Sequence, residues 1–426
     1  MFLSTRKPEA IYKFIVSACK KNIENDLKKK INLEIFKVGK FPKINFLFFV
    51  VYFIFSLKIF SKQKRLNLKF KNIEIGRFVT AQSFNNFNSY NSKLSFFKNY
   101  IKNLLIAGKI LNSAMQYSKN NKIDAIYIDH CGYINGVLYS FFSNTKTTVY
   151  SNNFPQTIYK INFKNIKNKF FKKYENSLII HKKIHLRKKK ISKCKIILKS
   201  IFSKPNQLKH MLKTKYLKLP KVNYQKFDYV IYTHSFTDGQ LWYGLDEFEN
   251  TLDWIRFTLN EFKNTNKNIL IKAHPNFYEK SIGLLSEWDK KLYLGLKNEF
   301  RNDKNFYFLD KSVFNYELLK KLRRDCVLIS HHGTVILEGA NIGFKTISSQ
   351  ANFFNKKFNI SNLWSTKKEY KLLLNKNFEV INSPIKKDFY SLIYQVYINK
   401  FSYSGKNFWQ NIIANQMGIS TEQYKE

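Results

Sequence analysis

Two short stretches of the chain each run from apolar to polar residues and carry side chains suited to binding a phosphate. The first is residues 326–343, CVLISHHGTVILEGANIG, in which an apolar run leads through SHHGT into a second apolar pattern. This pattern predicts a buried parallel strand, a tight turn and a helix. Because the first N–H groups of a helix and its dipole favour an anion, the turn is a candidate phosphate site.

Within this stretch, Gly333 would let the backbone approach a ligand, and the Thr334 hydroxyl could cap the helix or bind a phosphate oxygen. Glu338 lies about one helical turn further on, where a carboxylate could accept hydrogen bonds from sugar hydroxyls. We expect the adjacent side chains of His331 and His332 to diverge, which argues against a metal site. An ordinary capped turn between a strand and a helix explains the same residues.

The second stretch is residues 268–276, NILIKAHPN, another apolar run with polar residues at its end. Pro275 would end the strand. Lys272 and His274 alternate with Ala273, so we expect their side chains to point to the same side. An imidazole beside an ammonium group is a good pair for binding phosphate.

Five of the eight histidines directly follow predicted strands: His130, His234, His274, His331 and His332. A lone histidine is more often structural than functional. Because ligands in open α/β sheets bind at the carboxyl ends of the strands, this placement predicts one site built from several strand ends.

The order of these motifs resembles a known family. The motifs are VIYTHSFTD at residues 230–238, Asp253-Trp254, IKAHP at residues 271–275, and HGT at residues 332–334 with Glu338 and Gly343. Together they resemble bacterial capsule and lipopolysaccharide glycosyltransferases, over about residues 227–350 and less closely over 123–155. The resemblance implies an α/β fold of GT-B type, in which two Rossmann-like domains with parallel sheets face a cleft.

The resemblance further implies transfer of a sugar from a nucleotide-sugar donor to a growing surface polysaccharide or glycolipid. A CMP-sugar is preferred on the resemblance alone. The developing charge on the leaving phosphate would be stabilised by the helix start at Gly333-Thr334 together with Lys272, His274 and His332. The sequence has no Asp-x-Asp of the kind that other transferases use for manganese, so we expect neither a metal nor a cofactor.

The acceptor hydroxyl also needs a general base, and three residues are candidates: Asp238, His234 and Asp129. Asp238 ranks first because some bacterial sialyl-type transferases carry an Asp-Gly motif in a comparable place, although Asp-Gly is also a common turn. Asp129, His130 and Asn135 follow a predicted strand at residues 123–129 and would face the acceptor. Asp129 could equally cap a helix.

The elements that position these residues form two α/β regions. In the first, residues 72–81 and 147–150 are predicted strands, and a long helix spans 93–120. From residue 227 the alternation is regular: strands at 229–233, 269–272, 306–309, 326–329 and 345–348, with helices at 247–262, 286–300, 316–323 and 334–340. Such alternation indicates a parallel sheet. Further helices are predicted at 390–397 and 407–417, the last crossing back onto the first domain by analogy with GT-B folds.

These elements predict four regions. Residues 1–70 would be an N-terminal helical region that could associate with a membrane. Residues 71–220 would be the acceptor domain, with a basic block at 158–221. Residues 221–400 would be the nucleotide-sugar domain, after a linker near Leu219-Pro220, and residues 401–426 would form the C-terminal helix.

Residues 44–60, INFLFFVVYFIFSLKIF, are the most apolar run, and three interpretations compete for them. A helix packed on the first domain ranks first. A helix lying in the cytoplasmic face of a membrane ranks second, supported by the basic residues that follow. A transmembrane span ranks last, since the run is shorter than the ~20 residues that a span needs.

The 426 residues carry a formal net charge of +45, enough to attract polyanions and anionic membranes. Residues 158–221 hold 21 Lys and Arg but only one acid, Glu175. This block would bind anionic phospholipid or a lipid-linked acceptor; no nucleic-acid motif is present, so no specific nucleic acid is expected. Four widely spaced cysteines and the lack of a signal sequence fit a cytoplasmic protein, peripheral at the inner membrane.

Other functions remain open. An epimerase or polyol-phosphate transferase of the same fold would use a similar donor site, and an epimerase would not need an acceptor edge around Asp129. A basic membrane- or RNA-binding protein without activity would use the block at residues 158–221 instead. A transferase-like scaffold in a capsule assembly complex is a further alternative.

Overall fold

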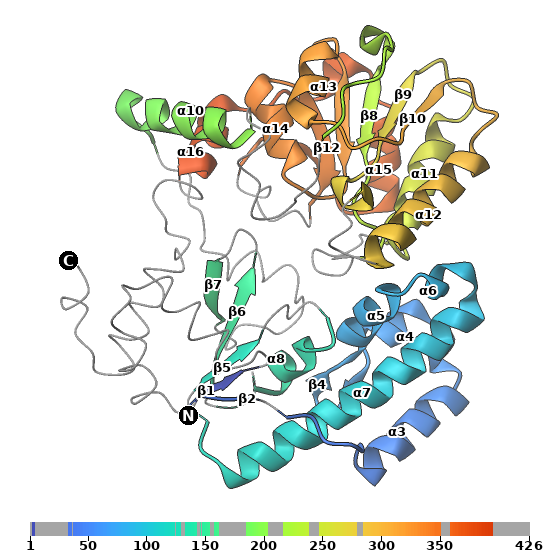
Figure 1. Cartoon of the computed structure of the whole chain (residues 1–426), viewed down its shortest axis with the longest axis vertical. Helices are drawn as coiled ribbons and strands as arrows, with labels where there is room; N and C mark the ends of the chain where they lie inside the picture. The colour runs from blue at the N-terminus through green and yellow to red at the C-terminus, as the bar shows by residue number, and fades with distance from the viewer. Residues whose placement is uncertain are drawn as a thin grey trace. The chain divides into compact units, whose positions relative to one another are not determined.

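The computed structural model describes residues 2–4, 33–35, 37–123, 125–128, 133–142, 145, 147–153, 157–161, 185–202, 216–237, 247–278, 284–350 and 358–394. The chain divides into two compact units (Figure 1). Unit 1 comprises Met1–Ser83, Asn88–Ile179 and Lys400–Glu426, and unit 2 comprises Phe84–Phe87 and Ile180–Asn399.

Unit 1 contains a five-stranded sheet in the order β2-β1-β5-β6-β7. Its strands are β1 (Phe2–Ser4), β2 (Leu33–Ile35), β5 (Ala125–Ile128), β6 (Thr148–Asn153) and β7 (Thr157–Ile161). The first four pair in parallel, and β7 pairs antiparallel to β6. The α/β pattern of this unit therefore begins at the start of the chain.

Two predictions for unit 1 are wrong. Residues 1–70 are not a purely helical region, because β1 and β2 join the sheet; three-residue strands are too short to show a period in the sequence. The predicted strand at 72–81 is only β4 (Ile73–Glu74), followed by helix α5 (Gly76–Phe84). Ile75, Phe78 and Val79 are buried at helical spacing, which the apparent alternation concealed.

The helices of unit 1 include the predicted long helix, α7 (Lys93–Asn120), and α8 (Gly136–Phe142). Helix α3 (Ile44–Phe55) packs along α7 through Phe46, Val50 and Phe53 (Figure 1). The remaining short elements are η2 (Lys58–Phe60), α4 (Lys62–Leu66), β3 (Lys69–Phe70) and α6 (Asn88–Asn91). The packed helix agrees with the first interpretation of residues 44–60. Within the part of the chain that is described, none of the helices has the length and apolarity to cross a membrane.

Unit 2 contains a six-stranded, fully parallel sheet in the order β10-β9-β8-β11-β12-β13. Its strands are β8 (Tyr229–Tyr232), β9 (Ile269–Lys272), β10 (Phe306–Leu309), β11 (Val327–Ser330), β12 (Lys345–Ser349) and β13 (Asn362–Trp364). The chain builds outward from β8 on one side, then returns to β11 and builds outward on the other. Five of these strands were predicted; β13 was not.

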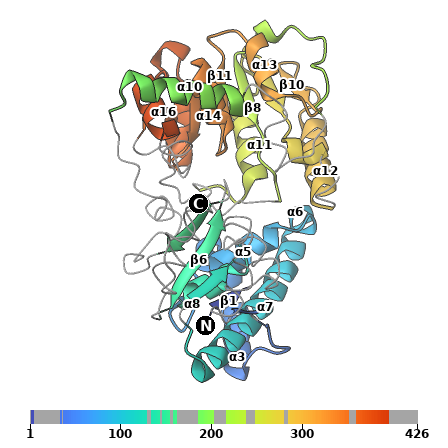
Figure 2. The ribbon, with the colours of Figure 1, turned by 60° about the vertical axis from the view of Figure 1, so that its left-hand side comes forward.

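The helices of unit 2 are α10 (Lys188–Phe202), α11 (Thr251–Phe262), α12 (Leu284–Glu299), α13 (Asn315–Lys321), α14 (Val335–Ile342), α15 (Lys367–Leu374) and α16 (Lys386–Ile393), with 3-10 turns η3 (Tyr224–Lys226), η4 (Pro275–Tyr278) and η6 (Phe378–Val380). They cover both faces of the sheet (Figure 2). Helix α10 lies in unit 2, packing Cys194 and Leu198 into one cluster with α14 and α16, whereas the sequence assigned it to the first domain.

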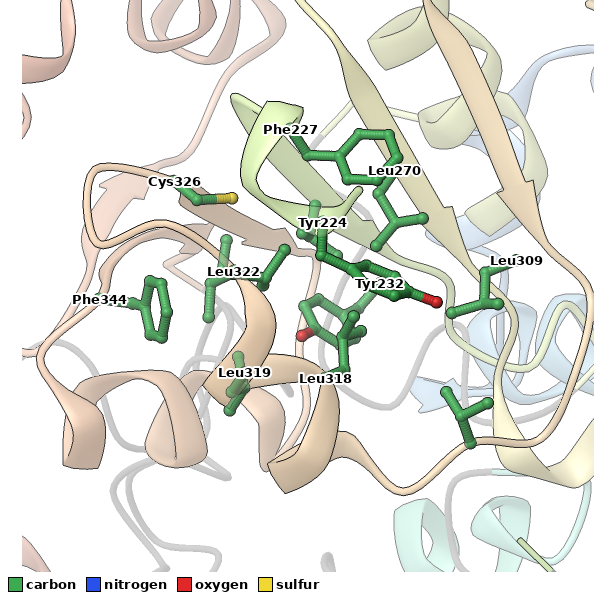
Figure 3. Close-up of a cluster of buried hydrophobic side chains, with 13 residues drawn as sticks. Tyr224, Phe227, Tyr232, Leu270, Leu309, Leu318, Leu319, Leu322, Cys326 and Phe344 are labelled. Atoms are coloured by element: carbon green, nitrogen blue, oxygen red, sulfur yellow. The ribbon is translucent and has the colours of Figure 1, made fainter. Parts of the chain in front are cut away.

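In unit 2, successive side chains of each strand point to opposite faces of the sheet, and both faces are packed. Val230, Leu270 and Leu328 belong to one buried cluster with Leu318 and Leu319 of α13. Figure 3 shows Leu270 on the side of the sheet that faces these two leucines. The adjacent residues of each strand point to the other face, where the ring of Tyr229 lies 4.7 Å from that of Phe262 in α11. Both faces of the sheet are thus buried, as parallel sheets require.

The α/β prediction is confirmed, with a parallel sheet in unit 2 and a mostly parallel sheet in unit 1. That the two sheets face a common cleft stays a prediction. The predicted helix at residues 407–417 lies outside the described residues.

Candidate functional site

The order of strands in unit 2 reverses between β8 and β11, which are neighbours in the sheet but lie far apart in sequence. The segments that follow β8 and β11 run to opposite sides of the sheet. In open α/β sheets, such a reversal opens a crevice at the carboxyl ends of the strands, where ligands bind. His234 follows β8, and His332 follows β11. The sequence predicts that polar residues at several strand ends form one site, and the distances between their side chains bear on this prediction.

Three imidazoles meet at this point. The ring centroids of His234 and His332 are 4.1 Å apart, and those of His234 and His274 are 5.3 Å apart. His332 is 3% exposed, whereas His234 and His274 are half-buried. The structure thus brings together three of the predicted site residues, one from the end of each of the adjacent strands β8, β9 and β11.

Burial and mutual repulsion make these imidazoles weak bases. Burial lowers the pKa of His332 well below its usual value, and the neighbouring histidines lower it further. The pKa of His274 is lowered in the same way, with added repulsion from Lys272. Both rings are therefore neutral at neutral pH and can each donate one hydrogen bond. An anion placed beside them would favour their protonation.

His331 packs among aromatic side chains, unlike the neighbouring His332, which belongs to the histidine cluster. Its ring lies edge-on to Trp254 and Trp364, with centroids 5.5 and 5.2 Å away, and it is almost fully buried. Its Nδ1 lies 2.9 Å from Nδ1 of His332, so the prediction that the two side chains diverge is wrong. The residues lie in a turn instead of a strand, and the alternation of a strand does not apply. His331 fixes the ring of His332.

Lys272 and Glu338 form a second polar group, on the face of the sheet that β8 and β9 turn toward α13 and α14. Lys272 is 3% exposed, and burial lowers the pKa of its ammonium group to about 8 although Glu338 partly offsets this effect. Burial also raises the pKa of Glu338, whose carboxylate accepts a 2.6 Å hydrogen bond from Nδ2 of Asn315. Lys272 lies 5.8 Å from the ring of Tyr232, the last residue of β8.

The turn before α14 has the backbone expected of a ligand-binding loop. Gly333 has φ +134°, a conformation that residues with a side chain rarely adopt. Thr334 does not cap the helix with its side chain, contrary to the prediction, because its backbone is already helical (φ −66°, ψ −18°). Its hydroxyl lies beside Glu338 instead and helps to lower the pKa of that carboxyl, against the larger effect of burial. The first N–H groups of α14 therefore have no side-chain cap from Thr334, and that of Ile336 donates to the carbonyl of Gly333 (3.4 Å).

The loop after β8 is held by a buried carboxylate. Asp289 of α12 is 1% exposed and accepts hydrogen bonds from the backbone N–H of Thr237 (2.9 Å), the Thr237 hydroxyl (3.0 Å) and the Ser235 hydroxyl. Thr233, at the start of this loop, donates from both its N–H and its hydroxyl to the carbonyl of Lys272. These bonds fix the path of the chain on either side of His234.

The other predicted residues lie elsewhere. Asp238, Asp129 and His130 are outside the described residues. Asn135 lies in unit 1, in the turn before α8. Asp253, part of the family resemblance, lies in the first turn of α11: Asn250 caps the helix by accepting from the N–H of Asp253, and the Asp253 carboxylate accepts from the N–H of Glu249. The roles of all predicted site residues in binding or catalysis remain predictions.

Sequence reasoning missed Tyr232, Asn315 and Asp289. Only Asp289 left a signal, because it lies at helical spacing with Tyr293 on the apolar stripe of α12, where an acid needs a buried partner. Although three imidazoles meet at the strand ends, the described part of the chain contains no set of three His, Cys, Asp or Glu residues arranged to hold a metal ion.

Comparisons with known proteins give only weak similarity. No protein-family model and no curated protein sequence matches the chain. Among solved structures, the chain is similar to KpsC of Thermosulfurimonas dismutans, a beta Kdo 2,4 transferase, with 10% identity, a TM-score of 0.39, and coverage of 64% of this chain and 80% of that one. It is also similar to UDP-GlcNAc 2-epimerase of Methanocaldococcus jannaschii, with 13% identity, a TM-score of 0.33, and coverage of 92% and 97%.

Proposed function

We propose that the protein is a glycosyltransferase that moves a sugar from a nucleotide-sugar donor to a growing surface polysaccharide or glycolipid. The observation that supports the proposal best is the meeting of His234, His274 and His332 at the switch point of the sheet in unit 2. Buried polar groups that converge at this point of a doubly wound sheet are typical of nucleotide binding. The ordered motifs that resemble capsule transferases supply the reaction class.

The donor's phosphate would lie against the start of α14. Gly333 lets the backbone approach it, and N–H groups at the start of the helix would donate to its oxygens. His274 and His332 would donate from their ring nitrogens, and Lys272 would supply the positive charge. As the bond between the sugar and the phosphate breaks, the leaving oxygen gains charge, and these fixed donors would stabilise it. Glu338 would accept from hydroxyl groups of the sugar.

The acceptor hydroxyl would attack the anomeric carbon while a base removes its proton. Asp238 or His234 would be this base, with Asp129, His130 and Asn135 proposed on the acceptor side. A CMP-sugar is the proposed first donor to try.

The test is nucleotide release from a panel of CMP-, UDP-, GDP- and CDP-sugars, with and without a lipid-linked oligosaccharide acceptor. We expect one donor to release its nucleotide faster when the acceptor is present, and the His274→Ala variant to lose this activity. His185→Ala is the matched control, because His185 is an exposed histidine of the same unit. A donor sugar that is only isomerised, without acceptor, would instead make the protein an epimerase.

A further inference from the structure

Helix α3 has two apolar faces, of which only one is covered. Phe46, Val50 and Phe53 are buried against α7. The opposite side also carries large apolar side chains, which are exposed: Ile44, Phe48, Val51, Tyr52 and Phe55. The exposed fraction is 68% for Phe48 and 80% for Phe55. A helix that packs in a soluble domain normally turns polar residues outward, so this exposed stripe needs another explanation.

The stripe continues beyond the helix on both sides. Before α3, Phe41 is 76% exposed, and after it Leu57 and Phe60 are exposed in and beside the turn η2. We call these residues, together with the five of α3, the α3 face. Such a contiguous set of exposed aromatic and aliphatic side chains marks an interaction surface.

The charges around the α3 face all have one sign. Lys37, Lys40 and Lys43 precede α3, and Lys58, Lys62 and Lys64 follow it. Residues 37–73 contain no Asp or Glu, and neither does α7, on which α3 packs. The ammonium group of Lys58 lies 3.4 Å from the Tyr52 hydroxyl, at the border of the apolar stripe. An apolar surface bordered only by lysines complements a surface that is apolar inside and negative at its rim.

We propose that the α3 face docks on an anionic phospholipid bilayer, with α3 lying in the plane of the interface. A helix of 12 residues is about 18 Å long, shorter than the ~30 Å hydrocarbon core, so it fits along the surface and not across it. Its apolar side chains enter the acyl boundary while the lysines reach the phosphates. A second copy of this chain is a poor occupant, because a symmetric contact would bring the same lysines together.

The α3 face combines charge with exposed apolar side chains, and the two contribute differently to membrane binding. Charge alone would give binding that salt abolishes, whereas inserted phenyl groups give binding that persists. For a transferase that acts on a lipid-linked acceptor, such docking would hold the enzyme on the surface that carries its substrate. The docking itself does not depend on that proposed function.

The test is flotation of the full chain with vesicles of equal parts phosphatidylcholine and phosphatidylglycerol, and with pure phosphatidylcholine vesicles, at low and high salt. We expect binding to the anionic vesicles that partly survives high salt. The double variant Phe48→Ser with Phe55→Ser should lose roughly tenfold or more in partitioning, because two exposed phenyl groups no longer enter the membrane. The control is Leu372→Ser with Val380→Ser, two similarly exposed residues of unit 2.

Two further measurements test whether the double variant is still folded and whether residue 55 enters the membrane. Thermal unfolding and nucleotide binding of the double variant should match those of the wild type, since the substituted side chains are exposed. A Phe55→Trp variant should show added fluorescence quenching by brominated lipids, and Leu372→Trp should not. Unchanged vesicle binding by the double variant would overturn the proposal. So would a dimer that the double variant dissociates while vesicle binding stays the same, which would make the α3 face a contact between copies.

Discussion

The imidazole rings of His234 and His332 lie 4.1 Å apart, one after β8 and the other after β11, at the point where the strand order of unit 2 reverses. Neither ring is placed by its own strand alone. Asp289 fixes the loop on the far side of His234, and His331, between two tryptophans, contacts the ring of His332. The cluster is therefore a preorganised group of weakly basic imidazoles, whose protonation an anionic ligand would favour.

The histidine cluster should make folding stability depend on pH. The pKa of His332 is below that of an unfolded histidine, about 6.5, so the unfolded state takes up a proton first as the pH falls. Stability is thus full above about pH 6.5 and declines as the pH falls below it. Urea unfolding of wild type and His332→Gln at several pH values measures this.

The His332→Gln variant should have a flatter profile below about pH 6.5 than the wild type. His185→Gln, at an exposed site, should leave the wild-type slope unchanged. Parallel profiles for wild type and His332→Gln would show that His332 is protonated in the folded protein and that the cluster does not lower its pKa.

Lys272 should weaken the fold while strengthening phosphate binding. Its folded pKa of about 8 lies below the unfolded value of about 10.4, so at neutral pH the buried charge lowers stability by roughly 3 kcal/mol, and the loss is recovered as the pH rises through this interval. We expect Lys272→Met to be as stable as the wild type or more stable, yet to bind nucleotide roughly tenfold or more weakly. Chemical denaturation and titration calorimetry measure the two effects.

The exposed Lys267→Met variant is the control for Lys272→Met and should change neither quantity. A Lys272→Met variant that binds nucleotide like the wild type would remove Lys272 from the phosphate site. A variant that is strongly destabilised at neutral pH would mean that the ammonium group supports the fold, contrary to the low pKa.

Two glycines in helices of unit 2 give a matched pair for testing how α14 is placed. A Cβ on Gly339 of α14 would meet Cδ1 of Leu328 at 2.5 Å and Cγ2 of Thr346 at 3.2 Å, whereas a Cβ on Gly295 of α12 meets nothing within 4 Å. Gly339→Ala should lower the free energy of unfolding by about 1–3 kcal/mol and weaken nucleotide binding, because α14 must move off the sheet.

Gly295→Ala, by contrast, should raise the free energy of unfolding by about 0.5–1 kcal/mol, since alanine is the better residue inside a helix. Thermal and urea unfolding of both variants check the pair. Equal effects of the two substitutions would mean that the sheet accommodates α14 loosely, and the helix start would then be a poor phosphate site.

Asp289 should be a positioning residue for the loop around His234. Asp289→Asn keeps the shape of the side chain but replaces one of the two acceptor oxygens with an amide donor, so either the Ser235 hydroxyl or the two donors of Thr237 lose their acceptor. We expect a loss of about 2–4 kcal/mol in the free energy of unfolding. Glu287→Gln, at an exposed acid of the same helix, should leave the free energy of unfolding almost unchanged. Equal stability of the two variants would contradict this role.

The parts that sequence predicted well are those with a strong local signal. Strands β9 and β10 have the predicted bounds, because each is an apolar run with polar ends, and α7 has a capping serine and buried residues at helical spacing from Phe96 to Ala114. Strand β1 has three residues and gave no periodic signal. Its place in the sheet depends on pairing with β5, which is far away in sequence.

The candidate site shows the same limit. Histidines after strands could be found from the sequence, but the contact between His331 and His332 depends on the turn that leads into Gly333, with its φ of +134°. The hydrogen bonds to Asp289 come from residues 52 and 54 positions earlier. No local pattern encodes such partners, since the fold alone brings them together.

The most direct test of the nucleotide site is the thermal stabilisation of the full chain by CMP, UDP, GDP and CDP, with His274→Ala and His185→Ala measured beside the wild type. A ligand at about 100 times its dissociation constant adds about 2.7 kcal/mol to the stability of the folded state. The account predicts that one nucleotide, CMP first, stabilises wild type and His185→Ala, and that His274→Ala loses the shift. No shift with any nucleotide, or an equal shift in His274→Ala, would contradict it.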